Sequence, residues 1–134
     1  MKKIALIVLV TLFGFHLSNA QTSEVQEDRI YSFVTLKDPP RFPGGIAKFY
    51  RFLVDNLKYP EAARAKKIQG TVFVSFIVEK DGSLSNIKTV RGLSTETDQE
   101  AERMLKISPK WEPGSLNGRP IRTQYNIPIK FALK

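Results

Sequence analysis

Apolar side chains recur with a helical period between residues 46 and 57. They occupy positions i, i+3, i+4, i+7 and i+11, which places them on one face of an amphipathic helix. The residues of this predicted face are Ile46, Phe49, Tyr50, Leu53 and Leu57. Pro60 then fits the first turn of a second helical piece, which we expect to continue to Gly70, a residue type that commonly ends helices.

From Thr71 onward the period changes to two, which is typical of a β-strand with one buried face. The side chains that share this face are Val72, Val74, Phe76 and Val78. Asp81-Gly82 is a hairpin signal because both residue types adopt turn conformations easily, and a second strand follows it. The alternation slips between Leu84 and Ile87, which indicates a β-bulge or a weakly specified register.

The run STETDQEAERMLKISP predicts the second main helix. Thr97 and Glu100 fit a capping box at its start, and Pro109 ends it. The buried stripe of this helix is expected to contain Ala101, Met104 and Leu105, with Ser108 at its margin.

The last strand, predicted for residues 121–134, has the most regular alternation in the chain. Pro128 has no N–H group, so we expect this strand at an edge of the sheet. Two interpretations remain open: the edge accepts a partner strand, or the proline is tolerated at an exposed edge that Lys130 and Lys134 protect from unwanted pairing. The order helix, hairpin, helix, strand predicts a small α+β domain with its helices on one face of an antiparallel sheet.

The N-terminal region reads as a targeting segment and a leader. Lys2 and Lys3, an apolar stretch and the small residues Ser18 and Ala20 predict a secretory signal peptide over residues 1–20; an uncleaved membrane anchor is the alternative. A polar, Pro-rich leader follows over residues 21–41, in which the run IYSFVTL is compatible with a short extra strand. The folded domain is expected over residues 42–134.

Composition removes several functional classes. The chain has no Cys, and its single His, His16, lies within the predicted signal peptide. Cys nucleophiles, Ser-His triads and His-ligated metals are therefore excluded from the mature domain, and we expect no enzyme activity, no cofactor and no metal. The formal net charge is +8, but the basic residues are scattered. The tight cluster of Arg64, Lys66 and Lys67 is read as a solvated helix end, so no nucleic-acid binding is expected.

Two long segments resemble the C-terminal domain of TonB, the periplasmic energy transducer of Gram-negative bacteria. They are YPEAARAKKIQGTVFVSFIVEKDGSLSNIKTVRG and PKWEPGSLNGRPIRTQYNIPIKFALK. Their matching positions are Tyr59, Pro60, Gly70, Asp81, Gly82, Pro109, Trp111, Pro113, Gly114, Asn117, Gly118, Pro120, Pro128 and Phe131. The runs RFPGG and NLKYP look like the version of the domain found in the Bacteroidota. From the residues alone, Trp111 is expected to close an edge of the core, and Asn117-Gly118 to form a turn.

The resemblance implies two helices against a three-stranded antiparallel sheet and no enzyme chemistry. It also implies a binding role, because TonB domains hold the extended TonB box of outer-membrane receptors by strand addition at the sheet edge. Carried over to this chain, the expected contacts come from the segment before Pro60 and from the last strand. These residues are Asn56, Leu57, Lys58, Tyr59, Arg122, Gln124, Tyr125, Asn126 and Lys130.

The short leader sets this chain apart from a full transducer, which has an inner-membrane helix and a long Pro-rich spacer. Residues 21–41 reach at most about 70 Å at roughly 3.3–3.6 Å per residue. We therefore expect a periplasmic protein-binding module whose partner is a receptor or another envelope protein. The alternatives are a membrane-anchored short transducer and a domain that binds peptidoglycan; a homodimer through the sheet edge is also compatible with the sequence.

Overall fold

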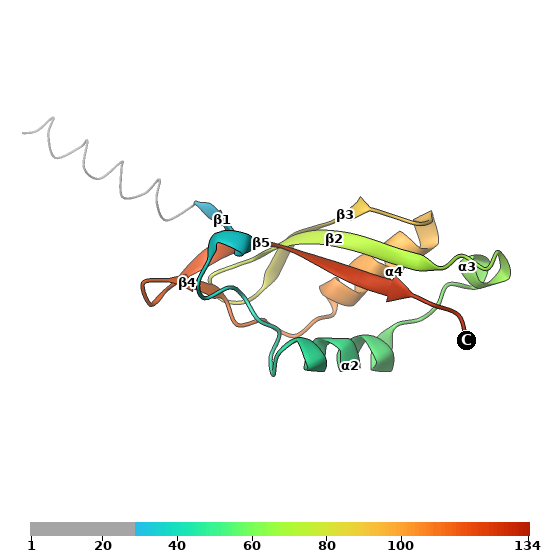
Figure 1. Cartoon of the computed structure of the whole chain (residues 1–134), viewed down its shortest axis with the longest axis horizontal. Coiled ribbons are helices and arrows are strands. Elements are labelled where there is room, and N and C mark those ends of the chain that lie inside the picture. Colours follow the sequence, from blue (N-terminus) through green and yellow to red (C-terminus); the bar gives the residue numbers. More distant parts are fainter. Residues whose placement is uncertain (1–28) are drawn as a thin grey trace, which may run out of the picture.

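Residues 29–134 of the chain are described by a computed structural model, which contains a mixed five-stranded sheet with helices packed against it (Figure 1). The strands are β1 (Ile30–Ser32), β2 (Gly70–Val78), β3 (Leu84–Arg91), β4 (Gly114–Leu116) and β5 (Arg119–Phe131). The helices are α2 (Ile46–Asn56), α3 (Glu61–Ala65) and α4 (Thr95–Lys106), and a 3₁₀ turn, η1 (Phe33–Thr35), follows β1. The predicted α+β class is confirmed.

The sheet is built around the β2–β5 pair, with strand order β1-β5-β2-β3. β2 is antiparallel to both β3 and β5, which is the three-stranded antiparallel arrangement that the resemblance implied. β1 is the extra N-terminal strand, and it runs parallel to the start of β5. β4 was not predicted; it forms a hairpin with β5 through Asn117 and Gly118, whose φ angles of 52° and 77° fit the expected turn.

The core lies on the sheet face that the alternation predicted. The buried side chains of β2 and β5 on this face are Val72, Val74, Phe76, Val78, Ile127, Ile129 and Phe131. α4 adds Ala101, Met104 and Leu105, as expected, and crosses behind the sheet in Figure 1. α2 lies beside β5 and adds Phe49 and Leu53 to the same core cluster.

The predicted apolar face of α2 is wrong in part. Phe49 and Leu53 are buried, whereas Ile46 is exposed and Tyr50 keeps 49% of its surface exposed. The physical reason is position: α2 packs at the margin of the sheet, so the core covers only a narrow stripe of the helix. Ile46 and Tyr50 form a second apolar stripe together with Val54, which is 81% exposed. This stripe points away from the core.

Two helix boundaries also differ from the prediction. α3 ends at Ala65, because Lys67 adopts a positive φ of 53° and turns the chain before Gly70, which begins β2 instead of ending a helix. At α4 the capping box lies one turn earlier than expected, with Ser94 as the N-cap. The Ser94 hydroxyl accepts a hydrogen bond from the N–H of Thr97 (3.2 Å), and the Thr97 hydroxyl accepts one from the N–H of Ser94 (3.0 Å).

The predicted irregularity in β3 is confirmed. The register with β2 shifts between the pairs Ser75–Lys88 and Ile77–Ser85, so β3 contains an extra residue there. Asn86 lies inside this shift with a positive φ of 49°, a conformation that Asn tolerates better than most residues. The bulge interrupts the outer edge of β3.

Trp111 closes one edge of the core, as expected. Its buried ring packs edge-on against Phe42, Phe49 and Phe76, and its indole N–H donates to the Ser108 hydroxyl (2.9 Å). Ser108 therefore lies beyond the end of α4 and supports the tryptophan rather than the helix stripe. The backbone N–H of Trp111 donates to the carbonyl of Gly82 (2.9 Å), which ties the β2–β3 turn to the core edge.

None of the helices within residues 29–134 combines the length and the apolar character that crossing a membrane requires. The predicted signal peptide, residues 1–20, and the first part of the leader lie outside the described residues.

Candidate protein-binding edge

One edge of β5 lacks a neighbouring strand over much of its length. On its other side β5 pairs with β2 from Thr123 to Phe131. On this side β1 pairs only with Arg122–Gln124. Within the described part of the chain no strand pairs with this edge from Tyr125 to Phe131, so its main-chain groups face away from the sheet. The predicted edge position is thus correct for the C-terminal part of the last strand and not for its start.

Pro128 lies in the middle of this free stretch, opposite Phe73 of β2, and the register continues without a shift on both sides of it. An antiparallel ladder alternates between pairs that exchange two hydrogen bonds and pairs that exchange none. Because proline cannot donate a hydrogen bond, the unbroken register indicates that Phe73 and Pro128 form a pair that exchanges no hydrogen bonds. In such a pair the proline nitrogen points toward the free edge. Pro128 therefore removes one donor from the edge and leaves the acceptors in place.

The opposite edge of the sheet, formed by β3, is less suited to pairing. Its register shifts twice relative to β2, and the bulge at Asn86 disturbs the spacing of its main-chain groups. Bulges of this kind protect exposed edges from adding strands. The regular edge available to a partner is therefore that of β5.

A groove of about 770 Å³ lies between α2 and the free edge of β5. We call it the α2–β5 groove, and its lining residues are Tyr50, Leu53, Val54, Leu57, Thr71, Pro128, Lys130, Ala132 and Lys134. The α2 wall is apolar except for the Tyr50 hydroxyl, and the opposite wall carries two exposed lysines, Lys130 of β5 and Lys134 beyond its end. No Asp or Glu side chain is among the lining residues.

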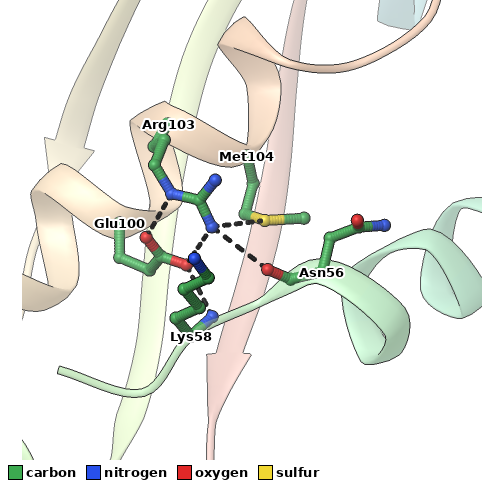
Figure 2. Close-up of polar contacts among 5 residues, drawn as sticks. All are labelled: Asn56, Lys58, Glu100, Arg103 and Met104. Atoms are coloured by element: carbon green, nitrogen blue, oxygen red, sulfur yellow. Dashed lines mark hydrogen bonds and ion pairs between the residues drawn. The ribbon is translucent and has the colours of Figure 1, made fainter.

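The segment that leaves α2 toward α3 is fixed to α4 by a buried carboxylate (Figure 2). Glu100 accepts a hydrogen bond from the backbone N–H of Lys58 (2.6 Å) through Oε2. Its two oxygens also accept from Arg103, at 2.6 Å from Nε and 2.8 Å from Nη2. The same Nη2 donates to the carbonyl of Asn56 (3.1 Å). These contacts, which we call the linker clamp, set the end of α2 and thereby one end of the α2–β5 groove.

The protonation of Glu100 follows from this environment. The side chain is only 9% exposed, and burial alone would raise its pKa. The hydrogen bonds from Arg103 and from the Lys58 backbone, with the charges of both residues, outweigh burial and lower the pKa below its ordinary value. Glu100 therefore stays ionised near neutral pH and keeps the linker clamp closed. The sequence-based assignment of Glu100 to the capping box was wrong because Ser94, three residues before Thr97, supplies the cap.

A family model described as Gram-negative bacterial TonB protein C-terminal matches residues 55–133, which is more than half of the chain. The chain belongs to this family. The match covers the linker clamp and all of β5, and it confirms the resemblance indicated by the sequence motifs. The family is a non-enzymatic one.

Known TonB proteins are similar over the same region. Protein TonB of Helicobacter pylori (strain J99) is 33% identical over 79 residues, which cover 58% of this chain and 26% of that protein. Protein TonB of Vibrio cholerae is 32% identical over 78 residues, covering 58% of this chain and 32% of that protein. The chain therefore spans about a quarter to a third of the length of these relatives. The solution structure of Helicobacter pylori TonB-CTD has a TM-score of 0.51 at 28% identity, and the similarity covers 66% of this chain and 79% of that one.

In this TonB C-terminal domain the residues expected around the linker have separate roles. Leu57 lines the α2–β5 groove. The Lys58 side chain is exposed, and its charge helps to lower the pKa of Glu100. The Asn56 side chain donates back to the carbonyl of Phe52 (2.9 Å) at the helix end. Tyr59 packs its ring against Phe131, and its hydroxyl donates to the carbonyl of Ile68. The side chains of Leu57 and Lys58 thus have no hydrogen-bond role in the described contacts, whereas Asn56 and Tyr59 make hydrogen bonds within the domain.

The expected residues of β5 divide in the same way. Asn126 and Lys130 are exposed along the free stretch, and Lys130 lines the groove. The others make contacts within the domain: the Gln124 amide donates to the Ser75 hydroxyl (3.1 Å), and Tyr125 packs against the core, where burial raises its pKa.

Arg122 forms an ion pair across the sheet. Its Nε donates to Oε1 of Glu79 (2.7 Å), and Glu79 also accepts from the Ser85 hydroxyl. The hydrogen bond from Arg122 is the main reason that the pKa of Glu79 is lowered, and burial opposes it only in part. This contact, like the β1 pairing, removes Arg122 from the free stretch of the edge.

Sequence reasoning missed several residues of the groove: Tyr50, Val54, Thr71, Ala132 and Lys134. A signal for the helix side was present, since Ile46, Tyr50 and Val54 recur every four residues beside the buried stripe. A helix with two adjacent apolar stripes has more apolar surface than one small core covers. The surplus indicates a surface that can contact a partner.

Proposed function

We propose that this TonB C-terminal domain is a protein-binding module of the cell envelope, which binds an extended segment of its partner by strand addition along β5. The observation that carries the proposal is the regular edge of β5 from Tyr125 to Phe131, which no described strand covers. A partner segment that pairs there gains main-chain hydrogen bonds, while its alternate side chains face two different surfaces.

The α2–β5 groove supports this binding mode and suggests its specificity. One set of partner side chains would face the apolar wall formed by Tyr50, Val54 and Leu57. A carboxylate near either end of the segment would face Lys130 or Lys134, which are exposed and share the groove with no Asp or Glu side chain. Apolar contact and charge attraction together would favour aliphatic segments that carry an acidic residue.

The kinship with TonB proteins suggests which partner to test first. We propose that the segment is the TonB box of an outer-membrane receptor, or a comparable segment of another envelope protein, and that binding belongs to TonB-dependent transport. The periplasm is then the compartment in which the domain works. No catalytic step is proposed; within residues 29–134 no cluster of three or more acidic, His or Cys side chains is arranged to hold a metal.

A charge placed in the groove tests the proposal. Val54 is 81% exposed on the α2 wall, so Val54→Glu leaves the core intact but puts a carboxylate where we expect the apolar side chains of the partner. We expect binding of a TonB-box peptide to weaken by about tenfold or more in isothermal titration calorimetry, because the carboxylate interrupts the apolar wall and repels the acidic residue of the segment.

Val90→Glu is the matched control, because Val90 is also exposed (55%) but lies on β3, away from the groove. Its affinity for the peptide should equal that of the unchanged chain. Equal binding by the Val54→Glu variant would refute the role of the groove, and equal losses in both variants would indicate a general charge effect.

A further inference from the structure

The start of the β5 edge is covered by the chain's own N-terminal segment. Ile30, Tyr31 and Ser32 pair in parallel with Arg122, Thr123 and Gln124. We call residues Ile30–Thr35, which comprise β1 and η1, the edge cap. The edge cap and the free stretch from Tyr125 to Phe131 follow one another along the same edge of the same strand.

The edge cap stops where the free stretch begins. If β1 continued as a strand, its next residues would pair with Tyr125 and beyond, and the chain would cover its own edge. Instead η1 starts at Phe33 and turns the chain away, with the N–H of Leu36 bonded to the Phe33 carbonyl (3.4 Å). The Phe33 ring packs against the Tyr125 ring with 4.5 Å between centroids, so the cap contacts the first residue of the free stretch.

The contacts that hold the edge cap are few. Its pairing with β5 spans three residues, Ile30 is 44% exposed, Val34 is 72% exposed, and η1 contains no buried residue. Short terminal segments with so little buried surface open at low free-energy cost compared with a core strand.

The chain just after the cap is held much better. Asp38 and Arg41 form bridges to Ser115 and Glu112, and Phe42 is part of the core. The cap can therefore leave the edge while its C-terminal end stays attached to the domain. It also precedes residues 55–133, so membership of the family does not account for it.

We propose that the edge cap is a displaceable strand that competes with a partner for the start of β5. A partner segment confined to Tyr125–Phe131 binds beside the cap, whereas a longer segment that also pairs with Arg122–Gln124 must release it. This inference rests on the proposed strand addition and adds a regulation of that site: the cap sets how much of the edge a partner can use.

A reversible cross-link can test the competition because the chain has no Cys of its own. Ser32 and Gln124 are in register and both are exposed, so the double variant Ser32→Cys, Gln124→Cys can form a disulfide between β1 and β5. Paired strands lie about 4.8 Å apart, which is within the range that a disulfide spans. Oxidised and reduced forms of the same full chain then differ only in whether the cap can leave.

The probes are two synthetic peptides from one TonB box. The short peptide is long enough to pair only with Tyr125–Phe131 of β5, and the longer one can also pair with Arg122–Gln124. We expect oxidation to weaken binding of the long peptide to the level of the short one, by about tenfold, since the lost pairs remove several hydrogen bonds. The short peptide should bind both forms equally. Amide hydrogen exchange at Ile30–Ser32 should accelerate only when the long peptide binds the reduced form.

The possible outcomes separate the two proposals. If oxidation changes the affinity of neither peptide and both bind, the displaceable cap is refuted while strand addition stands. If oxidation weakens both peptides equally, the cap does not compete for the start of β5 and the inference fails. If neither peptide binds either form, the proposed function fails and the cap has no role as its regulator.

Discussion

At the scale of single residues, a buried hydroxyl in the sheet is left without a partner. Thr123 is fully buried, and its hydroxyl has no hydrogen-bond partner among the described residues. Burying an unpaired hydroxyl costs free energy that an apolar side chain of similar shape does not. We expect Thr123→Val to raise the free energy of unfolding by about 1 kcal/mol, which corresponds to a melting temperature about 4–8 °C higher in a domain of this size. Thermal unfolding followed by circular dichroism measures the change.

Thr97 provides the matched control for this substitution, because it is also fully buried but its hydroxyl completes the capping box with Ser94. Thr97→Val should lower stability by about 1 kcal/mol, as removal of a helix cap commonly does. A Thr123→Val variant that melts below the unchanged chain would contradict the assignment of Thr123 as an unpaired group.

At the scale of secondary-structure elements, the linker clamp joins α2 to α4 and makes stability depend on pH. The pKa of Glu100 is lowered in the folded protein, so the unfolded chain binds a proton at a higher pH than the folded chain does. The contribution of the clamp is complete above the ordinary value of 4.5 and is lost as the pH falls through the folded pKa. Urea unfolding between about pH 7 and pH 3 should show this loss.

Glu100→Gln isolates the contribution of the linker clamp. The Gln amide is neutral and has one acceptor oxygen in place of two, so it forms no ion pair with Arg103 and cannot accept all the hydrogen bonds that Glu100 accepts. We therefore expect the variant to be less stable by about 1.5–3 kcal/mol near pH 7 and to lose less stability on acidification. Glu79, whose pKa is lowered chiefly by the hydrogen bond from Arg122, contributes in the same direction in both proteins and cancels in the comparison. Parallel pH profiles for the two proteins would contradict the role of Glu100.

The elements also show what the sequence could and could not predict. Period-two and helical patterns identified β2, β5, α2 and α4, because each buries one face against a single core. The bulge in β3 was visible as a slip in the alternation. β4 and β1 carry too few residues to show a period, and their strands exist because β5 offers them an edge. The buried role of Glu100 depends on the approach of Lys58 from another element, which no local pattern encodes.

The candidate site was predictable to a similar extent. Pro128 correctly indicated an edge, since a proline is compatible with pairing on one side only. On the α2 wall of the groove, Tyr50 was predicted on the buried face and is half exposed, because periodicity shows which residues share a face but not how much of that face the sheet covers. Tyr59 and Arg122 were expected to contact a partner, and the structure gives both strong contacts within the domain.

At the scale of the whole molecule, the two edges of the sheet differ, and the proposed strand addition at β5 depends on that difference. β3 ends the sheet with a bulged, irregular edge, whereas β5 presents a regular edge beside an apolar groove with basic residues. The edge cap then divides the β5 edge into a covered start and a free end. A partner strand is therefore expected at one place on the molecule, between the edge cap and the C-terminus of β5.

The most direct test is a backbone amide NMR titration of the chain with TonB-box peptides from outer-membrane receptors of the same bacterium. We expect chemical-shift changes concentrated at Tyr125–Phe131 and along the groove wall from Tyr50 to Leu57, with the amides of β3 unchanged. Changes confined to β3, or no change at peptide concentrations on the order of 1 mM, would contradict strand addition at the β5 edge.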